Sequence, residues 1–353
     1  MSGAPPVPAA SESVSESSES FMAREIAEIP EAAAPLCAAW PEAERAAAAL
    51  RGRAFPFAVV CGRGSSGHAG VHLRYLIETR LGLPVSASAP SVVTGYGRPP
   101  RMEGALFVTI SQSGRSPDLV AATRAAREGG ALTLALLNDA ASPAAQAADL
   151  VLPIGAGPER AVAATKTVVN SLVAGAALVA HWAGDGALAR GLAALPPRLS
   201  AALALDWGAW AADLADAPAA FVTGRGLGLG PVREIALKLA ETLRLPALGY
   251  SAAELRHGPR AAIAAATPVL ALRQDDPLAE GIDALVADLR QAALRVHACG
   301  GPGGSLPWLA PGHPACDPIA MLVPAYRAIE REARRRGLDP DAPVGLTKVT
   351  ETL

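Results

Sequence analysis

Apolar segments that end in glycine- and serine-rich turns alternate with helical segments along most of this chain. In its first half, apolar runs begin near residues 57, 84, 105, 131 and 149, and helical patterns fill 68–82 and 119–130. Strands that alternate with helices build a parallel sheet with helices on both faces. The pattern therefore predicts an α/β fold made of doubly wound parallel sheets.

The second half of the chain repeats this order of elements. Gly62-Arg63-Gly64 and Gly224-Arg225-Gly226 each follow an apolar run, and the two motifs lie 162 residues apart. Further strand candidates are 267–276, 295–303 and 318–324, with helical patterns at 232–245 and 281–294. An internal duplication with a boundary near 185–215 explains the repetition.

The length of the chain suits two domains, since 353 residues divide at about 150 residues per domain. Pro30 and Pro41 mark helix starts or breaks in an Ala- and Glu-rich region. We expect four parts: a disordered tail over 1–21, a first domain with N-terminal helices over 22–195, a second domain with a connecting helix over 196–335, and a C-terminal tail over 336–353.

Composition excludes several classes of partner. Lys and Arg total 31 against 33 Asp and Glu, and aromatic residues make up 4%, so neither a basic surface nor a stacking platform for nucleic acid is expected. The longest apolar stretch, 171–184, is shorter than the roughly 20 residues that span a bilayer, which favours a buried helix and no membrane contact. The N-terminal residues have no signal-peptide pattern.

The four cysteines form no metal-ligand or disulfide pattern, because no two of them occur as CxxC. Reduced thiols in a cytoplasmic protein, with no metal site and no cofactor, are the expectation.

Two polar turns follow apolar runs and open helices. The first is Gly62-Arg63-Gly64-Ser65-Ser66 and the second is Ser111-Gln112-Ser113-Gly114-Arg115-Ser116. Backbone N–H groups at a helix N-terminus and serine hydroxyls both donate hydrogen bonds to an oxyanion. Two such turns on neighbouring strands predict a phosphate site at the carboxyl edge of the sheet, although Ser and Gly also serve as ordinary helix caps. Neither turn is a GxGxxG or P-loop motif, so a nucleotide is not indicated.

Five ordered motifs resemble one family. SQSGRSP (111–117) resembles the phosphate loop of the sugar isomerase (SIS) domain, and four further segments are similar to later motifs: GPERAVAATKT (157–167), EIALKLAET (234–242), SAAELRHGP (251–259) and DPDAPVGLTKVTET (339–352). Over roughly 50–353 the chain resembles the isomerase half of glutamine–fructose-6-phosphate aminotransferase and the type II glucosamine-6-phosphate deaminases. The resemblance implies two SIS domains, each with a flavodoxin-like three-layer sandwich around a five-stranded parallel sheet.

The resemblance also implies which residues bind the sugar phosphate. The matching positions are Gly64, Ser65, Ser66, Ser111, Gln112, Ser113 and Ser116 in the two turns, and Ala163 and Thr165 in a third loop. For Thr165 and the adjacent Lys166, a helix start followed by a solvated lysine is the alternative interpretation.

Four residues match the family's catalytic positions. Glu241 matches the glutamate that moves a proton between C1 and C2, with Lys238 three residues earlier on the same helix face, where a simple salt bridge is the alternative. His257 matches the ring-opening histidine, which in the family reaches the neighbouring subunit's site and implies a homodimer. Lys348 matches the lysine that engages the open-chain carbonyl, or else is a solvated lysine in a frayed terminus.

The family's aminotransferases carry a glutaminase domain with a catalytic cysteine after the initiator methionine, whereas residue 2 here is Ser. The expected function is therefore conversion of glucosamine-6-phosphate to fructose-6-phosphate and ammonium. The alternatives are a deglycase or deaminase for fructosamine or galactosamine 6-phosphate, ammonia-dependent synthesis, and a non-catalytic sugar-phosphate sensor.

Overall fold

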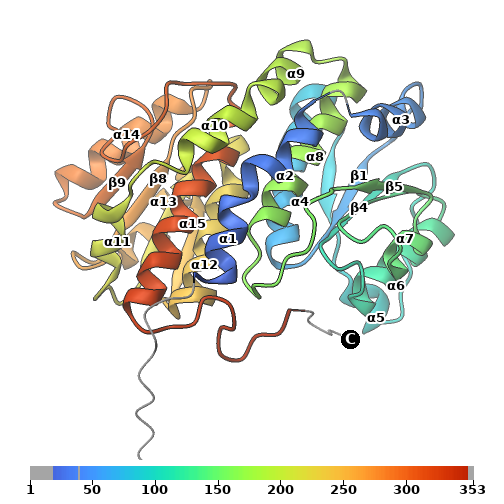
Figure 1. Cartoon of the computed structure of the whole chain (residues 1–353). Coiled ribbons are helices and arrows are strands. Elements are labelled where there is room, and N and C mark those ends of the chain that lie inside the picture. The colour runs from blue at the N-terminus through green and yellow to red at the C-terminus, as the bar shows by residue number, and fades with distance from the viewer. Residues whose placement is uncertain (1–18, 39, 349–353) are drawn as a thin grey trace, which may run out of the picture.

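The computed structural model describes residues 19–38 and 40–348, which form two parallel sheets flanked by helices (Figure 1). The first sheet has the order β2-β1-β3-β4-β5, with β1 Ala58–Cys61, β2 Val85–Ala87, β3 Leu106–Ser111, β4 Leu132–Leu137 and β5 Leu150–Pro153. The second has the order β7-β6-β8-β9, with β6 Ala220–Gly224, β7 Ala247–Ser251, β8 Val269–Leu272 and β9 Val296–Cys299. The predicted α/β fold is confirmed.

The second sheet repeats the strand order of the first, and β1 begins at Ala58 where β6 begins at Ala220, an offset of 162 residues. The offset agrees with that of the two glycine motifs. The prediction of five strands in each sheet is wrong for the second, which has four strands in the part of the chain that the structure describes.

The segment 318–324, predicted as a strand, instead lies in the long helix α15 (Asp317–Arg335). Pro318 occupies the first turn of this helix, where proline is tolerated, and residues 317–326 are buried without a break. A short, fully apolar run does not distinguish a buried strand from a buried helix, and the amphipathic pattern of 325–335 decides between them.

The strand β7 was not predicted from the sequence. It lies at the edge of the second sheet, and its residues are half-buried or exposed, so the segment lacks the apolar alternation by which strands are recognised.

Helices of the first half cover both faces of the first sheet. Pro30 and Pro41 stand in the first turns of α2 and α3, as predicted. The bounds are α1 Phe21–Ala27, α2 Ile29–Cys37, α3 Pro41–Leu50, α4 Gly64–Leu81, α5 Ser91–Thr94, α6 Pro117–Glu128, α7 Pro143–Ala147 and α8 Lys166–Ala183. The expected tail over 1–21 lies outside the described residues up to residue 18, and α1 already begins at Phe21.

The connecting region 196–216 is helical, as expected. It contains α10 Leu195–Ala202 and α11 Gly208–Leu214, after α9 Gly186–Ala193. The second half then adds the short 3-10 helices η1 Gly226–Gly228 and η2 Pro259–Ala262 and the helices α12 Leu229–Leu243, α13 Ala252–Arg256 and α14 Ala279–Gln291.

A layer of helices joins the two sheets. Helix α4 packs against both α8 and α12, and α12 packs against α15, so that one sheet lies on each side of this layer (Figure 1). Helices α4 and α12 approach closely at Gly230, where an added Cβ would lie 2.5 Å from the carbonyl oxygen of His68. Gly230 therefore allows α4 and α12 to pack closely where the two halves meet.

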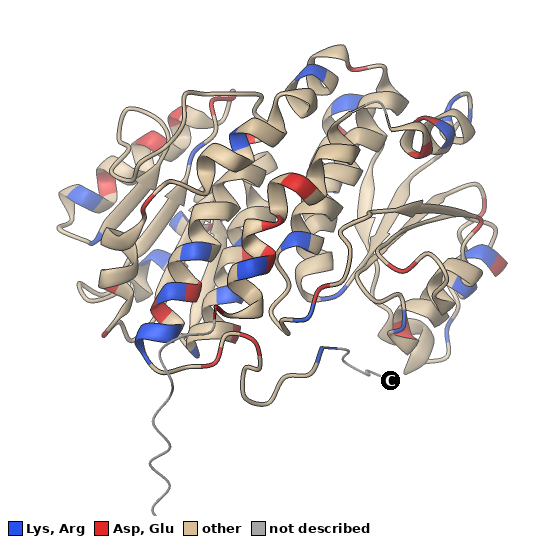
Figure 2. Cartoon of the chain, viewed as in Figure 1, with Lys and Arg blue, Asp and Glu red and all other residues tan. Residues whose placement is uncertain are grey.

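The distribution of charged residues and the burial of helix α8 relate to the expectation of no nucleic-acid and no membrane partner. Acidic and basic residues are interspersed on the face drawn in Figure 2. Residues 166–180 of α8 are buried, and among the described residues no helix is long and apolar enough to cross a membrane. All four cysteines are buried free thiols, namely Cys37, Cys61, Cys299 and Cys316.

We expect Gly230→Ala to destabilise the protein by about 1–3 kcal/mol, because backbone atoms must move to admit the methyl group. Gly175→Ala in α8 is the matched control, since its new Cβ would lie 3.4 Å from the flexible Leu73 side chain. Alanine is a better helix former than glycine, so the free energy of unfolding of this variant should equal that of the parent or exceed it by up to about 1 kcal/mol. Urea unfolding measures both, and equal midpoints for the two variants would contradict the assigned close approach.

His72 is a fully buried histidine in the same layer. Its Nδ1 lies 2.9 Å from the carbonyl oxygen of Leu227, and its Nε2 has no hydrogen-bond partner among the described residues. Burial lowers the pKa of His72 to about 4, from an ordinary value of 6.5.

Between pH 6.5 and 4 the unfolded chain therefore binds a proton at His72 that the folded protein does not. Stability is lost as the pH falls through this window, by about 3 kcal/mol in total. We expect His72→Asn to remove this part of the pH dependence, measured as the free energy of unfolding at pH 7 and pH 4.5. A variant with the same pH slope as the parent would refute the neutral, buried state of His72.

Candidate active site

The two polar turns lie side by side at the carboxyl ends of adjacent strands. Strands β1 and β3 pair in parallel, with Cys61 opposite Thr109, so the turns that follow them meet at one sheet edge. An ion pair of 2.7 Å joins Arg63 in the first turn to Asp118 in the first turn of α6. The predicted convergence of the two turns is thus present in the fold.

The first turn forms the N-terminus of α4. Gly64 begins the helix with a φ of +47°, which favours glycine, and Ser65 and Ser66 follow in its first turn. The hydroxyl of Ser65 donates a 3.1 Å hydrogen bond to Oε1 of Glu234 on α12. Ser65 therefore links the turn to the second half of the chain.

The second turn closes on itself and ends in helix α6. The Ser111 hydroxyl accepts from the backbone N–H of Gly114 at 3.0 Å, and Gln112 and Ser113 follow half-buried. Gly114 has a φ of +61°, and a Cβ there would lie 2.0 Å from the Ser142 hydroxyl. Ser116 is the N-cap of α6, and its side chain makes no capping bond.

A row of charged side chains, Glu234, Lys238 and Glu241, lies along helix α12, and its first two members are buried. Glu234 is 1% exposed and lies within hydrogen-bond distance of Nδ1 of His68 (3.0 Å) and the hydroxyl of Tyr326 (3.3 Å). Burial acts to raise the pKa of Glu234, but the Lys238 ammonium, together with His68 and Ser65, lowers it overall. Glu234 is therefore a buried carboxylate.

Lys238 connects Glu234 to Glu241. Its side chain is 1% exposed, and its Nζ lies 3.5 Å from Glu234 and 2.5 Å from Glu241. Burial acts to lower the pKa of Lys238, but the two carboxylates raise it overall. Glu241 is 21% exposed, so this row of charged side chains reaches solvent at the Glu241 carboxylate. The salt bridge considered from the sequence is present, but it is buried at its lysine end.

A third loop, residues 154–165, follows β5 and is organised by the buried Glu159. The carboxylate of Glu159 accepts hydrogen bonds from the backbone N–H of Thr165 (3.0 Å) and from the hydroxyl of Thr167 (2.7 Å). Ala163 and Thr165 are both buried in this loop, and Thr165 is the N-cap residue of α8.

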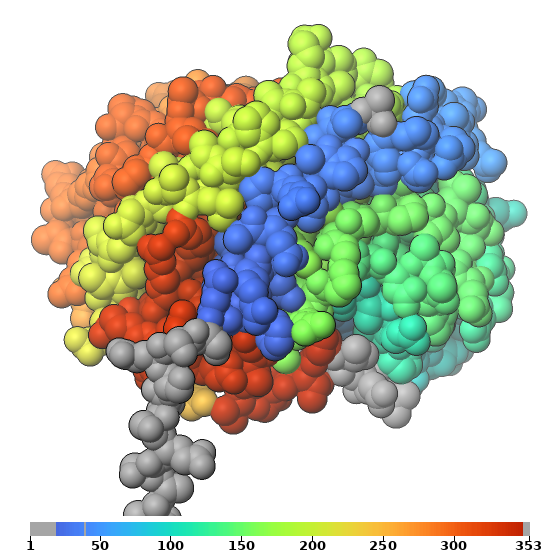
Figure 3. All heavy atoms as spheres, viewed as in Figure 1, coloured from blue at the N-terminus to red at the C-terminus, as the bar shows by residue number. Residues whose placement is uncertain are grey.

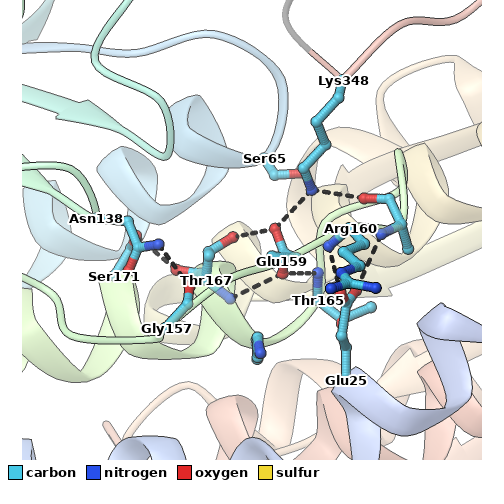
Figure 4. A network of polar contacts seen from close by, with 12 residues as sticks. Glu25, Ser65, Asn138, Gly157, Glu159, Arg160, Thr165, Thr167, Ser171 and Lys348 are labelled. Carbon is cyan, nitrogen blue, oxygen red and sulfur yellow. Dashed lines mark hydrogen bonds and ion pairs between the residues drawn. The ribbon is translucent and has the colours of Figure 1, made fainter. Parts of the chain in front are cut away.

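The C-terminal tail brings Lys348 to this third loop. Its Nζ lies 2.9 Å from Oε2 of Glu159 and donates to the carbonyl oxygen of Ala161 at 2.5 Å (Figure 4). Lys348 is thus held by defined partners rather than lying free in a frayed terminus.

The Lys348 cluster and the α12 cluster are electrostatic neighbours, because the Glu159 carboxylate contributes to the raised pKa of Lys238. Ser65 thus contacts Glu234 of the α12 cluster, which ends at the partly exposed Glu241, and the Lys348 amine contacts Glu159 of the neighbouring cluster. Such a set can bind an oxyanion, move a proton and engage a carbonyl carbon.

His257 does not join this cluster within one chain. It follows α13, its side chain is exposed, and among the described residues no contact connects its imidazole to Glu241 or Lys348. In the same segment the Ser251 hydroxyl caps α13 by accepting from the N–H of Glu254.

Several residues of the site were not assigned from the sequence. Glu159 lies in the motif 157–167 and Glu234 in the motif 234–242. Glu234 precedes Lys238 by four residues, a spacing that indicates an ion pair on one helix face. The alternative interpretation of Lys166 as a solvated lysine was wrong, because Lys166 is buried in an ion pair with Glu28. His68, for which the sequence analysis assigned no role, faces Glu234. In both cases the partner comes from another element of the fold.

No group of three or more His, Cys, Asp or Glu side chains in the described ranges is arranged to hold a metal ion.

Comparisons with known proteins agree with this architecture. The model of the SIS domain matches residues 58–181. A crystal structure from Silicibacter pomeroyi DSS-3, described as a candidate phosphosugar isomerase, is 41% identical and superposes with a TM-score of 0.87, covering 92% of this chain and 100% of that one. The chain belongs to the SIS-domain family of phosphosugar isomerases.

More distant relatives are aminotransferases and a deaminase. Glutamine–fructose-6-phosphate aminotransferase of Symbiobacterium thermophilum is 35% identical over 312 residues, which are 82% of this chain and 50% of that protein. The chain thus spans about half the length of this curated relative. Glucosamine-6-phosphate deaminase of Thermotoga maritima shares the fold, with a TM-score of 0.76, 21% identity and coverage of 94% and 100%.

We expect Lys238→Met to destabilise the protein by about 3–5 kcal/mol, because Glu234 is left as a buried charge without its cation. The double variant Glu234→Gln/Lys238→Met removes both charges and should regain roughly half of the loss or more. Urea unfolding of the parent, both single variants and the double variant at pH 7 gives the coupling. Additive effects would mean that the two side chains are not a buried pair.

Proposed function

We propose that this chain is an amino-sugar phosphate isomerase and deaminase that converts glucosamine-6-phosphate and water to fructose-6-phosphate and ammonium. The observation that carries the proposal is the partly exposed Glu241 carboxylate, which the buried Lys238 holds. The other carboxylate partner of Lys238, Glu234, accepts a hydrogen bond from Ser65 of the first serine turn. We also propose that the second half, over 196–335, is a divergent second SIS domain, since its sheet repeats the strand order of the first.

The serine turns are the proposed phosphate site. Ser66, Ser111, Gln112, Ser113 and Ser116 supply neutral donors, and the N-termini of α4 and α6 add partial positive charge. The two cations of these turns already have acidic partners, because Arg63 is paired with Asp118 and Arg115 with Asp139.

Glu241 is the proposed base for the isomerisation. In the open-chain substrate it takes the proton from C2 and returns a proton to C1, through an enolamine, to give the protonated imine of fructose-6-phosphate. Water adds to C2 of this imine and ammonia leaves, which completes the balance. The sequence moves protons and water only, so the proposal names no cofactor.

Lys348 is the proposed partner of the carbonyl carbon. Its amine is already directed to the third loop by Glu159 and Ala161, where Ala163 and Thr165 would close on the sugar. An amine at this place can form a Schiff base with the keto group or stabilise a developing oxyanion.

His257 is the proposed acid for ring opening, acting in the site of a second subunit. Its exposure, and the absence of a contact to Glu241 or Lys348 among the described residues, fit a role completed by a homodimer. Four buried free thiols fit the reducing conditions of the cytoplasm, where we place the reaction.

We expect purified protein to release equal amounts of ammonium and fructose-6-phosphate from glucosamine-6-phosphate, and Glu241→Gln to lower kcat by about 10²–10⁴-fold. Glu44→Gln, an exposed glutamate on α3, is the control and should match the parent. Coupled assays of both products measure the effect, and a circular-dichroism melt checks the fold.

A panel with galactosamine and fructosamine 6-phosphates tests the neighbouring substrates. If only one of these compounds is turned over, it replaces glucosamine-6-phosphate as the proposed substrate, and the proposed class of reaction is unchanged. A thermal shift with sugar phosphates and no product from any of them would overturn the enzyme proposal in favour of a sensor.

A further inference from the structure

Asp341 in the C-terminal tail makes a two-oxygen contact with the start of helix α1. Its Oδ2 accepts from the backbone N–H of Phe21 at 2.7 Å, and its Oδ1 accepts from that of Met22 at 2.8 Å. The Ser20 hydroxyl accepts from the next N–H, that of Ala23. The first three N–H groups of α1 are thereby satisfied, two of them by a residue 320 positions away.

The backbone of Asp341 also holds the third loop. Its carbonyl oxygen accepts from the N–H of Val162 at 2.9 Å. From the other side, the carboxylate of Glu25 on α1 accepts from the N–H groups of Arg160 and Ala161. Helix α1, the third loop and the tail are therefore tied to one another at consecutive loop residues.

Figure 3 shows the same arrangement on the surface, where the tail after α15 runs along the lower end of α1. Helix α1 contributes none of the proposed substrate contacts. Its N-terminus and Glu25 instead hold the two segments that carry Lys348 and its partners Glu159 and Ala161.

We propose that Asp341 is a positioning residue, which anchors the tail to α1 and the third loop so that the Lys348 amine is delivered to the carbonyl carbon of the sugar. This inference rests on the proposed role of Lys348. Lys348 lies seven positions after Asp341, and an extended segment of that length spans up to about 24 Å. An anchor at Asp341 therefore limits the volume that the amine can explore, which raises its effective concentration at the substrate.

We expect Asp341→Asn to lower kcat by about ten- to a hundred-fold with KM changed less than about threefold, because the phosphate turns are untouched. Asp216→Asn is the control, since it removes one exposed charge near the end of α15. Steady-state assays with glucosamine-6-phosphate give both constants, and Asp216→Asn should match the parent.

Reductive trapping provides a readout specific to Lys348. Its amine attacks C2 of fructose-6-phosphate, water leaves, and cyanoborohydride reduces the imine to a stable secondary amine. Trypsin does not cleave after the modified lysine, so mass spectrometry detects the uncut peptide 337–353. We expect its yield to fall in Asp341→Asn by about the same factor as kcat.

A proline substitution tests the contact without changing the aspartate. Phe21→Pro removes the N–H that Asp341 accepts, at a first helical position that tolerates proline and after Ser20 in an extended conformation. Phe21→Ala removes the ring, which lies 5.3 Å from the Arg160 guanidinium, but keeps the N–H. We expect Phe21→Pro to trap about three- to tenfold less product than Phe21→Ala.

Hydrogen exchange of the Phe21, Met22 and Val162 amides, in protein without substrate, separates failure of this inference from failure of the proposed function. If the parent neither turns over nor traps any sugar phosphate, the proposed function is lost and so is the positioning role. If the parent is active and Asp341→Asn exchanges faster yet traps as well as the parent, Asp341 is only a structural anchor and the inference is overturned. Unchanged exchange overturns the contact itself.

Discussion

A lysine ammonium buried between two carboxylates is the contact on which the site depends. Lys238 lies within 3.5 Å of both Glu234 and Glu241, and the charges of Lys238 and Glu234, each 1% exposed, could not remain buried without a partner. Ser65 and His68 from the first half complete the surroundings of Glu234. The same cluster therefore orients the proposed base and joins the two halves of the chain.

Most of the fold could be predicted because its strands carry the ordinary apolar signal. The first sheet, the repeat at 162 residues and the helices with Pro30 and Pro41 in their first turns all follow from local pattern. The two errors in assigning secondary structure arose where the apolar pattern of a segment does not indicate whether it forms a strand or a helix. β7 is an edge strand with little apolar content, and 318–324 is a helix buried all round, which local sequence does not separate from a strand.

The candidate site shows a similar division. Motif order brings Ser111, Glu241 and Lys348 to attention, and the structure gives Glu241 and Lys348 defined ion-pair partners. The partners of these residues could not be predicted in the same way, because Glu159, His68 and Asp341 act through neighbours distant in sequence. Pairings of that kind depend on how helices pack and not on any local spacing.

Helix α1 and the C-terminal tail meet although they come from opposite ends of the polypeptide, with 320 positions between Phe21 and Asp341. During synthesis the first of these segments leaves the ribosome long before the second exists. The Lys348 amine can reach its place only after the segment 341–348 has been synthesised and has docked on α1. Both sheets are complete in the nascent chain before this contact can form, so the Lys348 amine is positioned later than the core of the fold.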